Sequence, residues 1–217
     1  MNINSTYKGI RLIIGLVCLC FFNSKAQYIT NGNFEDTPRV GVTPTGWIRC
    51  LASPDTQPGF FCVTIPAWSG NSYLGEINVG YGNGETSGQI LIKPLNYDSI
   101  YFFTAFTTQY INTCNGPPST SGFTHLNLYF GNTTCDFNFL AYQSPEILNF
   151  NMWKEYCAIF KPNQNYTNVM ISPYGTVPGY RYLIIDNLDL AKAEDRLSYS
   201  LTGSNTSVCA GDRKSVV

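Results

Sequence analysis

Short runs of apolar and polar residues, separated by turn-forming residues, extend along positions 27–190. In one of them Leu126, Leu128 and Phe130 alternate with polar residues, so the apolar side chains share one face of a strand. No window of helical length repeats apolar residues every ~3.6 positions. Many short strands with turns between them predict an all-β sandwich or jelly roll. The expected strands are Phe60–Ile65, Ser72–Asn78, Ser87–Ile92, Ser99–Thr108, Thr124–Phe130, Met152–Lys161, Thr167–Ser172 and Tyr182–Leu190.

The N-terminus has the order of charges and apolar residues that is typical of a secretory signal. Lys8 and Arg11 precede the eleven uncharged, mostly apolar residues Leu12–Phe22, and Ser24–Ala26 supplies small residues at the cleavage positions. We therefore predict a signal peptide over residues 1–26, with the mature chain starting near Gln27. The protein is then secreted or displayed on the cell surface.

The alternatives at the N-terminus fit less well. A membrane span needs about 20 apolar residues, which is more than this run offers, and no later segment is long and apolar enough. A lipoprotein would need a small residue before its cysteine, but Val17 precedes Cys18 and Leu19 precedes Cys20.

Composition and charge narrow the class of protein. Charged residues make up 12% of the chain and aromatic residues 15%, and aromatic side chains favour strands. Residues 27–211 contain eight Lys and Arg against thirteen Asp and Glu, which gives a net charge of −5. Nucleic acids and anionic membranes attract proteins through basic patches, so neither is expected as a partner.

Six cysteines follow the predicted cleavage site, and none of them forms a CxxC pair. A zinc site is therefore not expected, and disulfides are the default in an exported chain. Cys50 and Cys62 would close a short loop, so we predict a bond between them. The partners of Cys114, Cys135 and Cys157 stay open.

The character of the chain changes after Leu190. Residues 191–197 form a short polar linker, and residues 198–211 read as the first strand of a second β-domain. Residues 212–217 (DRKSVV) match the translation of a common short-read sequencing adapter. We therefore expect these six residues to be an artefact and the chain to be the leading part of a longer protein.

Several motifs occur in a recognisable order between positions 27 and 190. Together they resemble calcium-containing jelly-roll carbohydrate-binding modules with a galactose-binding-like fold, as found in secreted and surface proteins of Bacteroidetes. The stub at 198–211 resembles the start of an Ig-like or PKD-type repeat. The motifs are Asn31–Glu35 (NGNFE), Gly46-Trp47, Gly70–Gly75 (GNSYLG), Gly88-Gln89, Trp153–Tyr156 (WKEY), Phe160–Pro162 and Leu183–Leu188 (LIIDNL).

The resemblance implies a structural Ca²⁺ that ties the N-terminal segment to the last strand. Glu35 and Asp186 would supply carboxylates, and Asn33 and the turn near Gly70 would supply carbonyls. Ca²⁺ takes six to eight oxygen ligands of both kinds, so the residue types suit the ion.

Carbohydrate-binding modules stack sugar rings on exposed aromatic side chains. Trp68 and Tyr81 lie in loop-like stretches beside Gly and Asn, so we predict that they contact ligand. Trp47 and Trp153 match positions that in such modules pack in the core.

Catalytic signals are weak in this sequence. His125 is the only histidine and has no nucleophile motif, and Glu76, Glu85, Asp136 and Glu146 are not paired by any pattern. We therefore predict a non-catalytic module that binds a polysaccharide or glycoconjugate, or that mediates adhesion, at the N-terminus of a larger surface protein. The alternatives are a purely structural β-sandwich spacer and an accessory domain of a secreted glycoside-active enzyme.

Overall fold

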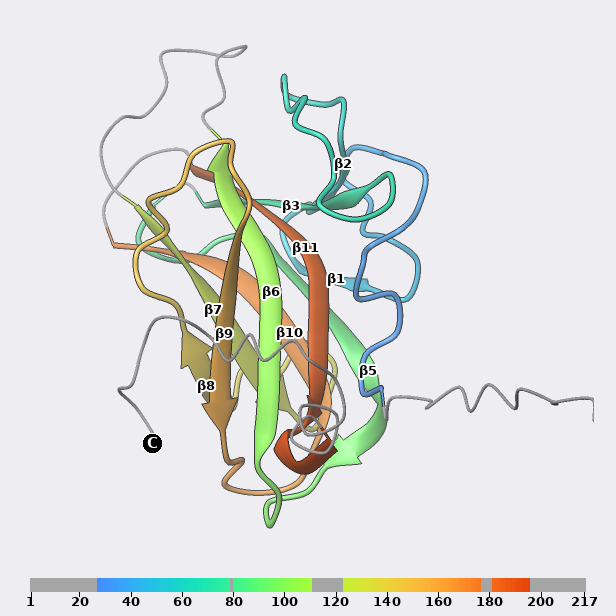
Figure 1. The fold of residues 1–217 in the computed structure, drawn as a ribbon, viewed down its shortest axis with the longest axis vertical. Coiled ribbons are helices and arrows are strands. Elements are labelled where there is room, and N and C mark those ends of the chain that lie inside the picture. The colour runs from blue at the N-terminus through green and yellow to red at the C-terminus, as the bar shows by residue number, and fades with distance from the viewer. Residues whose placement is uncertain (1–26, 79, 111–122, 177–180, 196–217) are drawn as a thin grey trace, which may run out of the picture.

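The computed structural model describes residues 27–78, 80–110, 123–176 and 181–195 (Figure 1). The predicted signal peptide, the predicted second β-domain and the last six residues lie outside the described residues and stay predictions. The linker predicted at 191–197 is described only in part: the last strand continues to Lys192, and a helical turn follows to Asp195.

Two antiparallel sheets pack face to face, which confirms the predicted all-β sandwich (Figure 1). Sheet B has the order β1-β5-β10-β7-β8, with β4 paired to β10, and sheet A has the order β2-β3-β11-β6-β9. The strands of sheet B are β1 (Ile48–Leu51), β4 (Gly82–Asn83), β5 (Thr86–Leu95), β7 (Thr124–Gly131), β8 (Phe139–Gln143) and β10 (Tyr166–Gly175). Those of sheet A are β2 (Asp55–Gln57), β3 (Tyr73–Asn78), β6 (Tyr101–Tyr110), β9 (Lys154–Phe160) and β11 (Arg181–Lys192).

The main core lies between the two sheets and is built by the alternation seen in the sequence. Leu126, Leu128 and Phe130 of β7 face inward against Phe103 of β6 and Leu183 of β11, and all five are fully buried. Burial of one large apolar side chain contributes about 1.5–3 kcal/mol, so this layer is the main source of stability. Trp47 is also buried in this core, as expected from the resemblance.

A smaller cluster covers the outer face of sheet A. Val63 packs on Tyr73 and Tyr182, and Trp153 meets Tyr73 edge-on. The Trp153 indole donates a hydrogen bond to the carbonyl of Pro66, 2.9 Å away. The loop over positions 58–68 is thereby held against sheet A.

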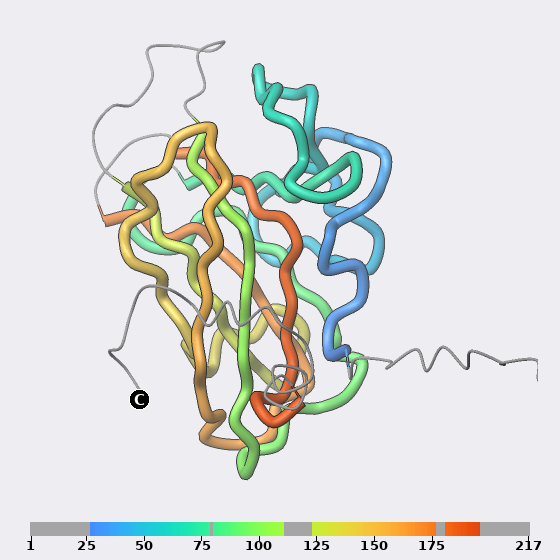
Figure 2. Tube along the Cα trace, in the orientation of Figure 1, coloured from blue at the N-terminus to red at the C-terminus, as the bar shows by residue number. Residues whose placement is uncertain are grey.

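The N-terminal segment connects the sheets along one side of the sandwich. The carbonyl of Tyr28 accepts a hydrogen bond from the Ile92 amide of sheet B, and that of Gly32 accepts one from Leu188 of sheet A. In Figure 2 the blue trace of this segment runs beside β11. A Cβ at Gly32 would collide with the Leu188 carbonyl, so this approach requires glycine.

One predicted strand is wrong. Residues 60–65 form a turn, in which the Val63 amide bonds to the Phe60 carbonyl and both Phe61 and Cys62 have positive φ. A strand requires extended backbone throughout, and the left-handed conformation of two successive residues prevents it. The apolar side chains of this run face the outer cluster of sheet A instead.

The predicted bond between Cys50 and Cys62 is also wrong. Cys50 is bonded to Cys135, 85 positions along the chain. Cys50 lies on β1 at the edge of sheet B, whereas the chain has crossed to the outer face of sheet A by Cys62. Closeness in sequence is therefore not closeness in space here, although Cys62 and Cys157 are each disulfide-bonded as well.

A carboxyl group is buried between the sheets at Glu76 of β3. The side chain is fully buried, and this burial raises its pKa well above the usual value; Glu85 adds to the rise and Ser87 opposes it. Neither carboxyl oxygen makes a hydrogen bond of normal geometry within the described part of the chain. The folded protein therefore favours the neutral acid.

Replacing Glu76 with glutamine should stabilise the protein at neutral pH. A raised folded-state pKa gives stability that is fully present below the unfolded value of 4.5 and is lost as the pH rises through the folded value. We expect Glu76→Gln to raise the free energy of unfolding by about 1–3 kcal/mol near pH 8, where an unpaired buried charge costs most. Urea unfolding followed from about pH 4.5 to pH 8 tests this. The exposed Glu155→Gln variant should match the parent protein, and a Glu76→Gln protein with the parent's pH profile would contradict the assignment.

The disulfide can be checked directly. Proteolysis without reductant should release a peptide in which Cys50 is linked to Cys135, and mass spectrometry identifies it. The Cys50→Ser/Cys135→Ser variant should lose about 2–4 kcal/mol of unfolding free energy, because the bond restrains a long loop in the unfolded chain. A Cys50–Cys62 peptide in the digest would overturn the pairing.

Candidate functional site

The outer face of sheet B carries a row of polar and aromatic side chains. The same alternation that sends Leu126 and Leu128 inward turns the intervening residues outward, and the register places Asn127 opposite Ser172 and His125 opposite Tyr174. The side chains that line this face are Thr86 and Ile90 of β5, His125, Asn127 and Tyr129 of β7, and Asn168, Met170, Ser172 and Tyr174 of β10.

Hydrogen bonds connect this row from strand to strand. The Asn127 amide donates to the Tyr129 hydroxyl at 2.8 Å, and that hydroxyl donates to Oδ1 of Asn83 on β4 at 3.0 Å. Thr86 donates to Ser172 at 2.9 Å. The side chains at the centre of the face are thus held in place before any ligand arrives.

The disulfide closes one part of this face. The sulfur of Cys50 lies over Gly88 of β5, where a Cβ would be only 3.0 Å from it. The loop that carries Cys135 also brings Phe137 edge-on against Tyr129, with ring centroids 5.2 Å apart. Met170 is fully buried beneath this cover.

The other part of the face is more open. His125, Tyr174 and Asn83 are half-buried there, and Gln143 of β8, opposite Asn127 in the register, is exposed. The ring centroids of His125 and Tyr174 are 6.2 Å apart. Nδ1 of His125 lies 2.7 Å from the Ser144 carbonyl, which can only accept, so Nδ1 donates this hydrogen bond.

The face is uncharged. None of the outward-facing residues of β5, β7 and β10 named above is an Asp, Glu, Lys or Arg. An anionic ligand would find no cation on these strands to compensate its charge, whereas a neutral ligand with hydroxyl groups finds donors and acceptors. Aromatic rings beside amide and hydroxyl groups are a common composition of small-molecule and sugar sites.

The two aromatic residues predicted to contact ligand lie on different sheets. Tyr81 is 74% exposed and stands two residues before Asn83, at the margin of the open part of sheet B's outer face. Trp68 is 49% exposed and stacks on Phe106 of sheet A. The two residues therefore do not share one site.

The predicted metal ligands Glu35 and Asp186 come from segments that the structure brings together. The Glu35 carboxylate accepts hydrogen bonds from the Asn71 amide at 2.9 and 3.1 Å, and Asp186 accepts one from the Ser69 amide at 2.9 Å. Asp186 is fully buried, and burial raises its pKa to about 6, with the nearby Glu35 charge adding to the rise. Asn33 is exposed in the same turn as Glu35.

The chemistry of this pair suits a hard cation. Neither carboxylate forms an ion pair with Lys or Arg within the described residues, so two like charges are left close together without a counter-charge. A Cβ at Gly70 would collide with the Glu35 carboxylate, so the turn fits tightly around it. Within the described residues, no three side chains of His, Cys, Asp or Glu lie close enough together to hold a metal ion. The remaining ligands would therefore be carbonyls or water, which Ca²⁺ accepts.

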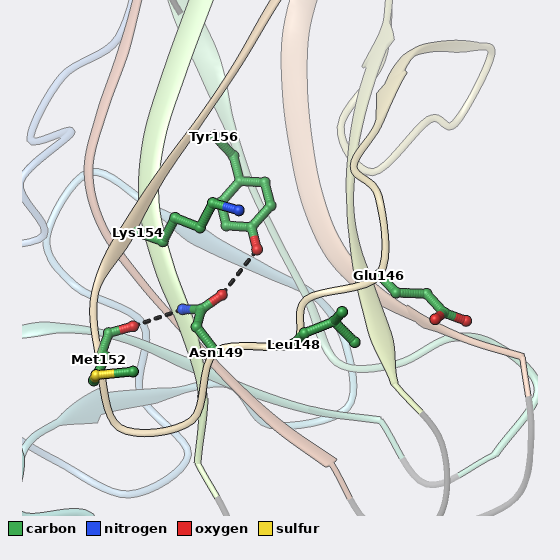
Figure 3. Close-up of a pocket in the computed structure, with 6 residues that line it drawn as sticks. All are labelled: Glu146, Leu148, Asn149, Met152, Lys154 and Tyr156. Carbon is green, nitrogen blue, oxygen red and sulfur yellow. Dashed lines mark hydrogen bonds between the residues drawn. The ribbon is translucent and has the colours of Figure 1, made fainter. Parts of the chain in front are cut away.

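A separate pocket of about 280 Å³ lies beside β9 (Figure 3). Tyr156 donates to Oδ1 of Asn149 at 2.8 Å, and the Asn149 amide donates to the carbonyls of Thr107 and Met152. These groups satisfy one another, and Figure 3 shows the Glu146 carboxylate pointing away from them. The pocket therefore lies beside a packed loop and offers few free hydrogen-bonding groups to a ligand.

Three of the candidate carboxylates, those of Glu76, Glu85 and Asp136, are buried or hydrogen-bonded to neighbouring residues. Glycoside hydrolysis needs two carboxyl groups on either side of the bond to be cleaved. Glu76 and Glu85 lie near each other, but Glu76 is fully buried and Glu85 bonds to the amides of Ile77 and Ser53. Asp136 bonds within its own loop, to Asn132 and Asn138.

Comparison with known proteins shows the fold. No protein-family model matches the chain, and no curated protein matches it in sequence. A solved structure of a cyclase from Fischerella sp. TAU is 12% identical with a TM-score of 0.51, covering 75% of this chain and 94% of that one. The arabinose-bound MgGH51 α-L-arabinofuranosidase is 11% identical with a TM-score of 0.55, covering 79% of this chain and 27% of that one. A CBM22-1 xylan-binding domain from Paenibacillus barcinonensis Xyn10C is 10% identical with a TM-score of 0.48, covering 78% and 97%.

Of these three structures, the cyclase and the arabinofuranosidase have TM-scores above 0.5. At these identities the likeness concerns the fold alone, and the site has to be judged on its own residues. No helix in the described ranges is long and apolar enough to cross a membrane.

Proposed function

We propose that this protein is a non-catalytic module that binds a neutral glycan on the open part of sheet B's outer face. The observation that carries the proposal is the uncharged row on that face, in which His125 and Tyr174 lie beside the amides of Asn83 and Gln143. Sugar rings offer an apolar C–H face to aromatic side chains and hydroxyl groups to amides. The aromatic rings of this surface can therefore stack on a sugar, and its amides can bond to the hydroxyl groups. Tyr81 would extend the aromatic surface at its margin.

The protein in this proposal is exported and is the leading module of a longer chain. Disulfides persist in oxidising compartments, so the Cys50–Cys135 bond supports an extracytoplasmic setting. The apolar run at residues 12–22 supports export, and the change in composition after position 190 supports further domains. A structural spacer without a ligand is the competing function, and the binding experiment below separates the two.

We also propose that Glu35 and Asp186 hold a structural Ca²⁺, with carbonyls from Asn33 and the turn near Gly70. The ion would remove the repulsion between two carboxylates that the fold places close together. It would tie the N-terminal segment to β11 through electrostatics, in addition to the Gly32–Leu188 hydrogen bond.

Binding should be detectable by affinity electrophoresis in gels that contain soluble polysaccharide. We expect retardation by at least one of xyloglucan, arabinoxylan, galactomannan and mixed-linkage β-glucan, and none by alginate or polygalacturonate. Since the face is uncharged, the retardation should be the same at about 0.15 M and about 1 M ionic strength. Tyr174→Ala should weaken binding about threefold to tenfold, because an aromatic contact contributes about 0.5–1.5 kcal/mol.

The matched control is Tyr97→Ala, which removes a tyrosine that is 51% exposed but lies outside the proposed face. It should bind like the parent protein. Equal weakening by the two variants would refute the proposed site. Absence of retardation by every neutral polysaccharide would refute the proposed function and favour a structural spacer.

Calcium should raise the melting temperature by about 5–10 °C at a concentration about 100 times its dissociation constant, because it binds the folded state alone. Differential scanning calorimetry of the protein with CaCl₂ and with EDTA measures this shift. The Asp186→Asn variant should lose the shift.

The exposed Asp98→Asn variant serves as the matched control for charge and should keep the shift in full. If the parent protein melts at the same temperature in CaCl₂ and in EDTA, the calcium proposal fails.

A further inference from the structure

Trp68 forms a rigid aromatic surface on sheet A, away from the proposed glycan site. Its indole stacks on the ring of Phe106, with centroids 4.0 Å apart and planes 12° from parallel. Phe106 covers one side of the indole, and 49% of the Trp68 residue remains exposed to solvent. A tryptophan with one face packed and another open is unlike the two other tryptophans, which pack against the hydrophobic clusters.

The loop that carries Trp68 is held on both sides. The Pro66 carbonyl accepts the Trp153 indole N–H, and the backbone amides of Trp68 and Ser69 bond to the Asp186 carboxylate. Ordering a free side chain costs about 0.5–1.5 kcal/mol on binding, and this side chain is already ordered. The indole is therefore preorganised to stack against a flat apolar surface of a ligand.

The surroundings of this indole indicate which ligand fits. Glu155 of β9 is exposed and lies opposite Phe106 in the register, on the same face of sheet A. A carboxylate accepts hydrogen bonds from hydroxyl groups and repels anions. A neutral pyranose matches both features, with its C–H face on the indole and its hydroxyl groups at the rim.

We propose that the protein is bivalent: Trp68 on sheet A forms a second glycan-binding surface, so that one molecule bridges two polysaccharide chains. The inference rests on the proposed function for sheet B and extends it. The two surfaces lie on the outer faces of opposite sheets, with the packed core between them. A single short glycan cannot reach both, so each surface takes its own chain.

A bridging assay tests bivalency. Each neutral polysaccharide of the electrophoresis panel is coupled to beads, the protein is bound, the beads are washed, and the same polysaccharide with a fluorescein label is added. The parent protein should retain the label on the beads. Trp68→Ala should reduce the retained label about tenfold or more, the effect of losing about 1.4 kcal/mol or more at one surface, while its binding through sheet B continues.

Controls separate the two proposals. The Tyr174→Ala/Trp68→Ala variant should bind more weakly than either single variant, and the conservative Trp68→Phe variant should recover much of the bridging. Retained binding by Trp68→Ala in the electrophoresis gels shows that the variant is folded. If the parent protein binds the beads but retains no label, or if Trp68→Ala bridges as well as the parent, bivalency is refuted and the sheet B site stands. If no polysaccharide binds at all, the proposed function fails and bivalency with it.

Discussion

The attachment of residues 28–35 to both sheets is the contact on which much of this structure depends. Tyr28 bonds to sheet B and Gly32 to sheet A, and the side chains of Ile29 and Phe34 enter the core between them. Each hydrogen bond contributes only about 1 kcal/mol, but the burial of the flanking apolar groups adds several times as much. The segment therefore closes one side of the sandwich and brings Glu35 to the last strand.

The same packing explains why the chemistry of the molecule lies on its outer faces. Every second side chain of β7 packs in the core, so the residues that alternate with these side chains face outward. On sheet B these residues bond to one another across strands, which keeps them ordered without a ligand. On sheet A a loop covers much of the outer face and leaves Trp68 at its margin.

Periodicity predicted the fold well because strands obey a local rule. The run around Leu126 needed only alternation to be assigned, and Leu126, Leu128 and Phe130 all lie in the core. The turn at Phe61 was missed because positive φ leaves no trace in an apolar pattern. Alternation also predicts that Asn127 and Tyr129 face away from Leu126 and Leu128. It could not show that β10 brings Tyr174 beside His125 of β7, because that contact depends on the register of two strands about 50 residues apart in sequence.

The Cys50–Cys135 bond has a consequence for how the protein is made. Cysteines of a growing chain appear in sequence order, so an oxidase that acts on them in that order would join Cys50 to Cys62, its nearest successor. The native partner appears 85 positions after Cys50, when β7 has already been synthesised. A bond formed early between Cys50 and Cys62 would therefore have to be exchanged before the native pair could form, by attack of a free thiolate on the disulfide.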